Sequence, residues 1–313
     1  MSRRAAAWLA WFLWALCVVF AVLAVSLALY TPPFPEGAPT WGVVLAVSFL
    51  AYPTVGAFVA SRRPKNLVGW ILCWVGLLFG SQGFVIAYAG YSISVRPDSL
   101  PREKIALWVA GWFDFPMLFL AAALLVLLFP DGRLPGRSWR IAPWIAVGGS
   151  LLWTLRLATD QMFPAYFFYR SMRNTFRVDG TLGVTMDVLG RLGQAALFII
   201  CVASVIAVFV RLESAQEQER QQIKWFAYAA SLLLGAVVVA PVVAGILARV
   251  GVPWGAAFAM PIWLGLLAIP VAVGVAILRY RLYEIDTLIN RTLVYGSLTA
   301  LLALVYFGGV TVV

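Results

Sequence analysis

Long apolar segments dominate this 313-residue sequence and restrict what it can fold into. A bilayer core is about 30 Å thick, so a helix needs about 20 mainly apolar residues to cross it. Nine segments reach or approach this length, at 5–30, 41–61, 67–91, 106–129, 141–159, 188–210, 225–248, 255–278 and 293–313. Backbone polar groups in lipid must bond within a segment, so we expect helices there. The sequence therefore predicts an all-α, polytopic integral membrane protein with about nine spans.

The composition agrees with this class and excludes several enzyme mechanisms. Hydrophobic residues make up 63% of the chain and charged residues 12%, whereas soluble domains carry about 45–50% and about 25%. The chain has no histidine, which excludes a Ser-His-Asp triad, a histidine proton relay and any His-ligated metal within it. Its three cysteines lie far apart in apolar stretches. We predict no catalysis, no cofactor and no metal site in these residues.

Basic residues predict the orientation of the spans. Loops on the cytoplasmic side of a membrane are enriched in Lys and Arg. With the N-terminus inside, 14 of the 23 basic residues fall on the inner side and seven on the outer side. We therefore expect a cytoplasmic N-terminus. The net charge of +10 follows from this orientation and from anionic lipid, and nucleic acid is not an expected partner.

The few ionisable residues inside or at the ends of the spans are candidate ligand-binding residues. They are Asp114, Arg156, Asp160, Asp187 and Arg191. Arg156 with Asp160, and Asp187 with Arg191, are spaced i,i+4 and can each pair on one helix face. If loop 160–187 folds back, the four form one charge cluster. Charge neutralisation near the membrane surface is the favoured interpretation, and a ligand or ion site built with Asp114 is the alternative.

Small residues follow one face of the third predicted helix. Gly69, Gly76, Gly80, Gly83 and Gly90 are separated by helical steps. Small residues let helix backbones approach closely in lipid. We expect an intramolecular packing seam, with a homodimer interface as the alternative.

The segment after the eighth span has the pattern of a short interfacial helix. Apolar residues Leu282, Ile285, Leu288 and Ile289 share one face, opposite Glu284 and Asp286. Arg279 and Arg281 precede them and are expected near lipid phosphates. These four charged residues are candidates for coupling the membrane region to a cytoplasmic partner. Residues 212–224 likewise predict a helical bridge between the sixth and seventh spans.

Three segments carry a resemblance to a known family. They are FPDGRLPGRSWR (129–140), ERQQIKWFAYA (219–229) and LRYRLYEIDTLINRTLVYG (278–296). They resemble the membrane-embedded N-terminal region of polytopic bacterial sensor histidine kinases and their relatives, met most often in actinobacteria. The resemblance covers residues 67 onward. It implies a multi-pass protein of the bacterial plasma membrane, and in the family the last motif leads through further helices to a cytoplasmic GAF and kinase module.

The sequence departs from this family by lacking the kinase module. No phosphoacceptor histidine and no Asn- and Gly-rich ATP-binding boxes occur. Nine spans with an inner N-terminus would place the C-terminus outside, so we expect either a tenth helix beyond Val313 or a non-kinase relative. Span 293–313 ends within an apolar run, and we interpret it as truncated and the chain as a fragment. Any kinase activity would then lie beyond residue 313.

Three functions remain open at this point. The first is the sensory input region of a two-component histidine kinase or of a non-catalytic relative. The second is a small-molecule or ion transporter, which the scarcity of midplane charge and the absence of a clear repeat disfavour. The third is an orphan structural or lipid-interacting membrane protein. The expected partners are the bilayer, a second copy of the chain, and a cytoplasmic kinase module or response pathway.

Overall fold

The computed structural model describes most of the chain as a helical bundle. The described residues are 2–31, 49–94, 105, 108–109, 112, 114–160, 162–163, 172–174, 176–249, 251 and 254–278. The predicted ninth span, 293–313, and the predicted coupling residues Arg279, Arg281, Glu284 and Asp286 lie outside them.

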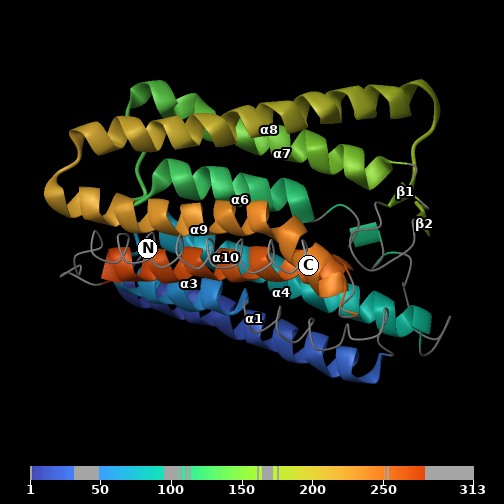
Figure 1. The fold of residues 1–313 in the computed structure, drawn as a ribbon. Helices are drawn as coiled ribbons and strands as arrows, with labels where there is room; N and C mark the ends of the chain where they lie inside the picture. The colour runs from blue at the N-terminus through green and yellow to red at the C-terminus, as the bar shows by residue number, and fades with distance from the viewer. Residues whose placement is uncertain are drawn as a thin grey trace, which may run out of the picture.

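Long helices running side by side form the bundle (Figure 1). In chain order the elements are α1 (Arg3–Tyr30), α3 (Ala51–Arg62), α4 (Leu67–Ser94), α6 (Asp114–Leu128), the 3-10 helix η1 (Arg137–Ile141), α7 (Ala142–Thr159), α8 (Gly180–Ser214), α9 (Glu217–Ala248) and α10 (Trp254–Leu278). Two short strands, β1 (Met162–Phe163) and β2 (Met172–Arg173), pair antiparallel between α7 and α8. The described chain is otherwise helical or turn, as the apolar segments predict.

Five of the described helices are long and apolar enough to cross a membrane. They are α1, α4, α7 taken with η1, α8 and α9. Two shorter apolar stretches, Pro116–Leu128 and Leu264–Ile277, lie in α6 and α10. These helices indicate a multi-pass membrane protein and agree with the predicted all-α class.

Outward faces of the helices are apolar as well. The side chains of Trp8, Phe12, Ile199, Val238 and Val242 are 80%, 64%, 66%, 74% and 60% exposed. Such faces would be unfavourable in water, where large contiguous apolar patches are rare. These apolar faces are instead suited to contact with the acyl chains of lipids.

Two helices begin earlier than their apolar segments predicted. The predicted spans begin at residues 188 and 225, whereas α8 begins at Gly180 and α9 at Glu217. The predicted bridge over 212–224 is therefore wrong as a separate helix: it consists of the end of α8, an extended break at Ala215 and Gln216, and the start of α9. The apolar windows report only the lipid-facing part of each helix, and polar residues continue both helices beyond it.

Helices pack both against their neighbours in sequence and against helices that are distant in sequence. Helices α1, α3 and α4 pack together, α7 packs along α8, and α9 packs along α10. Helix α10 contacts α3, and α6 contacts α4, α7 and α8. Cβ atoms built on Gly56 and Gly69 would lie 2.6 Å from Cys73 N and 2.7 Å from Ala60 N. Part of the predicted glycine seam on α4 therefore packs inside the molecule, against α3.

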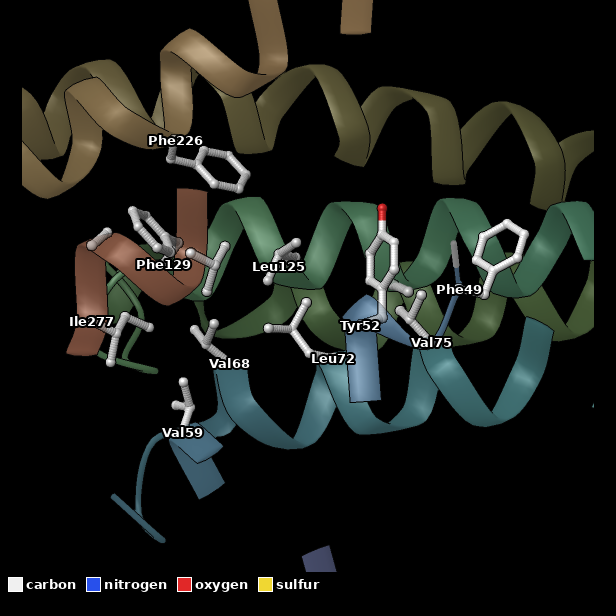
Figure 2. Close-up of a cluster of buried hydrophobic side chains, with 13 residues drawn as sticks. Phe49, Tyr52, Val59, Val68, Leu72, Val75, Leu125, Phe129, Phe226 and Ile277 are labelled. Carbon is white, nitrogen blue, oxygen red and sulfur yellow. The ribbon is translucent and has the colours of Figure 1, made fainter. Parts of the chain in front are cut away.

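One buried cluster joins five helices (α3, α4, α6, α9 and α10) and the turn after α6 (Figure 2). It contains Phe49, Tyr52, Val59, Val68, Leu72, Val75, Ala121, Leu125, Phe129, Phe226, Val273, Ala276 and Ile277. A second cluster joins α6, α7 and α8 through side chains such as Leu127, Trp153 and Leu197. Because α6 contributes to both, its C-terminal end is held by both halves of the bundle.

The connections gather at two ends of the bundle. At the left of Figure 1 lie the start of α1, the α3–α4, α6–η1 and α8–α9 turns, and the last residues of α10. We call this the turn end. At the right lie the end of α7, the strands β1 and β2, and the start of α8. We call this the strand end.

Candidate functional sites

At the strand end, one carboxylate is shared by two arginines. Asp187 Oδ1 lies 2.7 Å from Arg156 Nε, and its Oδ2 lies 2.9 Å from Arg191 Nε. The predicted i,i+4 pair of Asp187 and Arg191 is therefore present. Arg156, predicted to pair with Asp160, instead reaches across from α7 to Asp187 on α8.

Glycines on α8 allow this reach. The aliphatic stem of Arg156 packs directly against Gly190, where any Cβ would collide with it. A Cβ built on Gly149 would lie 2.6 Å from the Gly193 carbonyl oxygen, so the two backbones are in close contact. Arg156 Nη1 also donates to Gln194 Oε1 at 3.4 Å. Close helix approach therefore aligns the Arg156 guanidinium with the polar face of α8.

The loop that follows α7 is fastened to it by a buried asparagine. Asn174 Nδ2 donates to the carbonyl oxygens of Ala158 and Asp160, both at 2.9 Å. Its Oδ1 accepts from Phe176 N at 2.8 Å. Asp160 thus contributes its backbone to the strand end. Asn174 was not predicted as a site residue, since an asparagine in a long loop carries no signal of burial.

Asp114 is the first residue of α6, and its side chain lies outside the described part of the structure. The proposed ligand site that includes Asp114 therefore remains a prediction. The helix is tied to α7 nearby, where Ser150 Oγ donates to the Pro116 carbonyl oxygen at 3.0 Å.

The strand-end cluster carries one more positive than negative charge among Arg156, Asp187 and Arg191. The side chains of these residues are 18%, 40% and 66% exposed. Such accessible ion pairs contribute only about 0–1 kcal/mol to stability. The arrangement is suited to attracting an anionic group from outside the bundle, because the exposed Arg191 retains donors beyond the one that it directs at Asp187.

At the turn end, a buried arginine holds the turn that follows α6. Arg211, near the end of α8, donates through Nη1 to the Phe129 carbonyl oxygen and through Nη2 to that of Arg133 at 2.6 Å. Its Nη2 also lies 3.5 Å from the Leu127 carbonyl oxygen. The last carbonyls of a helix lack partners within the helix. The Arg211 guanidinium supplies donors to this helix end and to the turn beyond it.

The same turn is fastened to the start of α4. Asn66 Nδ2 donates to the Pro130 carbonyl oxygen at 2.9 Å, while its Oδ1 accepts from Val68 N and so caps α4. Gly132 has φ +74°, and a Cβ there would lie 2.6 Å from Leu67 N. Glycine is needed at this position both for the left-handed backbone and for the close approach.

Acidic residues balance Arg211. Glu219, in the first turn of α9, places Oε1 3.9 Å from Arg211 Nε. Asp131, in the turn itself, interacts electrostatically with both Arg211 and Glu219. A buried guanidinium is tolerated only when it is paired and hydrogen-bonded. The α6 turn, α8 and α9 thus meet around one charge.

Two further contacts extend the cluster to α10. Phe129 and Phe226 stack with ring centroids 4.7 Å apart, and Figure 2 shows Phe226 above Phe129 and Ile277 below it. Gln222 Nε2 donates to the Ala276 carbonyl oxygen at 2.8 Å. We call the set Asn66, Phe129, Arg211, Glu219, Gln222 and Phe226 the junction.

The junction brings together segments that were singled out separately in the sequence. Phe129 belongs to FPDGRLPGRSWR, and Glu219, Gln222 and Phe226 belong to ERQQIKWFAYA. The third segment begins at Leu278, two residues after Ala276. The motifs are recognisable in the sequence, but Asn66 and Arg211, the residues that connect them, were not predicted. Arg211 was counted only as a basic residue at a helix end, and nothing local distinguishes it from its exposed neighbours.

Within the part of the chain that the structure describes, no group of three or more His, Cys, Asp or Glu side chains could hold a metal ion. No known family model matches the sequence, and comparisons with curated proteins and with solved structures found no match. The fold and the two clusters therefore define the class, a helical protein of multi-pass membrane type.

Proposed function

We propose that this chain is the membrane-embedded input region of a signalling protein, as in two-component sensor histidine kinases or their non-catalytic relatives. In this proposal the strand-end cluster receives the signal and the turn end delivers it. The chain itself performs no catalysis, and kinase chemistry belongs to a segment or partner outside residues 1–313. The proposed membrane is the bacterial plasma membrane, crossed about nine times with the turn end in the cytoplasm.

The observation that carries the proposal is the junction. It ties four helices and the α6 turn together at the end of the bundle where α10 leaves toward the third motif segment. This arrangement supports transmission of movement to the chain that follows α10.

Helix α8 connects the two clusters without a break. Asp187 and Arg211 lie in the same continuous helix, about 36 Å apart at 1.5 Å per residue. A ligand that prefers one position of α8 relative to α7 would stabilise the corresponding position of Arg211. Only a signal with different affinities for two such states can shift their populations. An anionic ligand that competes with Asp187 for Arg156 and Arg191 has this property.

Hydrogen–deuterium exchange of the full chain in lipid nanodiscs tests this transmission. The change Asp187→Asn removes the charge that both arginines share and weakens the α7–α8 connection. We expect altered deuterium uptake in peptides covering residues 127–134 and 211–219, far from the substitution, because α8 transmits the shift to the junction.

The control is Asp179→Asn, which removes an exposed carboxylate 3.0 Å from Arg177 just before α8. It should alter exchange only near residues 176–182. Altered exchange confined to the strand end in both variants would contradict the proposal.

A further inference from the structure

We propose that the corner formed by η1 and the first turn of α7 binds the headgroup of an anionic phospholipid. The lipid corner consists of Arg137, Arg140, Ile141, Trp144 and Ile145. This inference is independent of the proposed signalling role, because it depends only on the chemistry of the corner and on its place at the turn end.

Two guanidinium groups project from the same side of η1. A 3-10 helix has three residues per turn, so side chains at i and i+3 lie above one another. Arg137 and Arg140 have this spacing and both are exposed. Neither takes part in any of the ion pairs found among the described residues, whereas Arg156, Arg177, Arg191 and Arg211 each face a carboxylate there. The two side chains are therefore available to an external anion.

Large apolar side chains adjoin the two arginines. Ile141, Trp144 and Ile145 are 65%, 76% and 38% exposed. Tryptophan concentrates at the headgroup level of membranes, where its ring is partly in lipid and partly in water. Arginine binds phosphate through paired N–H donors. The corner thus presents phosphate-binding groups beside surfaces for the acyl chains.

The corner is held firmly by the bundle. Leu134 and Trp139 pack against the buried cluster that joins α6, α7 and α8. Trp139 N donates to the Gly136 carbonyl oxygen at 3.3 Å, which closes the turn of η1. Asp131 and Glu219, at the same end of the bundle, interact electrostatically with Arg211. The backbone that carries the arginine pair is therefore held in place, and neither arginine has an ion-pair partner among the described residues.

The occupant is a phospholipid, and not free phosphate, because three exposed apolar side chains contribute nothing to binding an inorganic anion. Each basic residue near an anionic membrane surface contributes about 1 kcal/mol, and this is about a fivefold change in affinity. Removing both arginines should therefore weaken binding of the anionic lipid by about 25-fold.

Native mass spectrometry of the purified full chain, titrated with phosphatidylglycerol or phosphatidylcholine, tests the site. We expect Arg137→Gln with Arg140→Gln to weaken phosphatidylglycerol binding by about 25-fold and to leave phosphatidylcholine binding unchanged. Trp144→Ala should weaken both lipids to a similar extent. The single change Arg140→Gln provides the same test at about fivefold if the double variant does not fold.

The matched control is Arg62→Gln with Lys65→Gln, which removes the same charge from exposed positions at the same end. It should leave phosphatidylglycerol binding within about twofold of the wild-type value. An equal loss of phosphatidylglycerol binding in this control would show that binding depends on the overall positive charge of the turn end, and would overturn the site. Displacement of the lipid by millimolar inorganic phosphate, or unchanged binding by the Arg137 and Arg140 variants, would overturn it as well.

Discussion

Arg211 is the residue on which the turn end depends most. Its guanidinium is buried and serves the carbonyl oxygens of Phe129 and Arg133 while facing Glu219. Exposed arginines contribute little to stability, but a buried charge that loses its partners, or leaves them without a donor, is costly. The contribution of this residue therefore comes from its burial and not from its charge alone.

We predict that Arg211→Met destabilises the protein by about 3 kcal/mol, because buried carbonyl oxygens lose their donor and Glu219 loses its ion-pair partner. Arg220→Met is the matched control: it makes the same chemical change at an exposed position of the same end and should cost less than about 0.5 kcal/mol. Denaturant unfolding of the full chain in mixed micelles measures both. Similar losses in the two variants would show that Arg211 has no special role.

Sequence reasoning located the motif that contains this turn but not its partners. The Pro130–Gly132 stretch predicts a turn from local chemistry alone, and the structure has Gly132 at φ +74°. That Asn66 and Arg211 supply the donors is a result of tertiary packing, since they lie 64 and 82 residues away from the carbonyls that they serve. Spacing in the sequence contains no information on such contacts.

Among the elements, α10 shows how a helix with internal prolines is supported by a neighbour. Pro270 has no N–H, so the Leu266 carbonyl oxygen lacks its usual helical donor. Tyr52 from α3 fills this role, with its hydroxyl 2.7 Å from the Leu266 oxygen. The hydroxyl of Tyr52 therefore compensates for the backbone donor that Pro270 removes.

We predict that Tyr52→Phe costs about 1 kcal/mol in the wild-type chain, because the Leu266 carbonyl oxygen becomes unsatisfied. In a Pro270→Ala background the new N–H can reach Leu266, so the same change should cost close to nothing. A double-mutant cycle on unfolding free energies measures the difference. Equal costs in the two backgrounds would mean that the hydroxyl does not replace the missing donor.

The predicted helix bounds agree with the structure where a helix is apolar along its whole length, and they differ where polar residues continue the helix. The predicted span 5–30 and α1 (Arg3–Tyr30) agree closely, because a continuous apolar run leaves no alternative. The starts of α8 and α9 were placed about eight residues late because their first turns are polar. At the strand end, the Asp187–Arg191 pair was predictable from i,i+4 spacing, whereas the reach of Arg156 to Asp187 depends on helix packing.

At the scale of the whole molecule, exposed apolar faces surround a bundle in which the ion pairs of the described residues lie at its two ends. The strand end offers accessible charges with partly used donors, and the turn end offers a buried junction. Helix α8 spans the distance between them and contributes Asp187 to one and Arg211 to the other. This separation suits the proposed role, in which a signal is received at the strand end and transmitted to the turn end.

The central claim, that the turn end is the cytoplasmic output, is tested most directly by the accessibility of single introduced cysteines. Lys65→Cys at the turn end and Asp179→Cys at the strand end both replace exposed residues. The wild-type chain, in which Cys17 and Cys73 are buried and Cys201 is half-buried, is the blank whose labelling is subtracted. A membrane-impermeant maleimide added to intact cells should label Cys at position 179 and not at 65, and inside-out vesicles should reverse this pattern. Labelling of position 65 from outside intact cells would contradict the account.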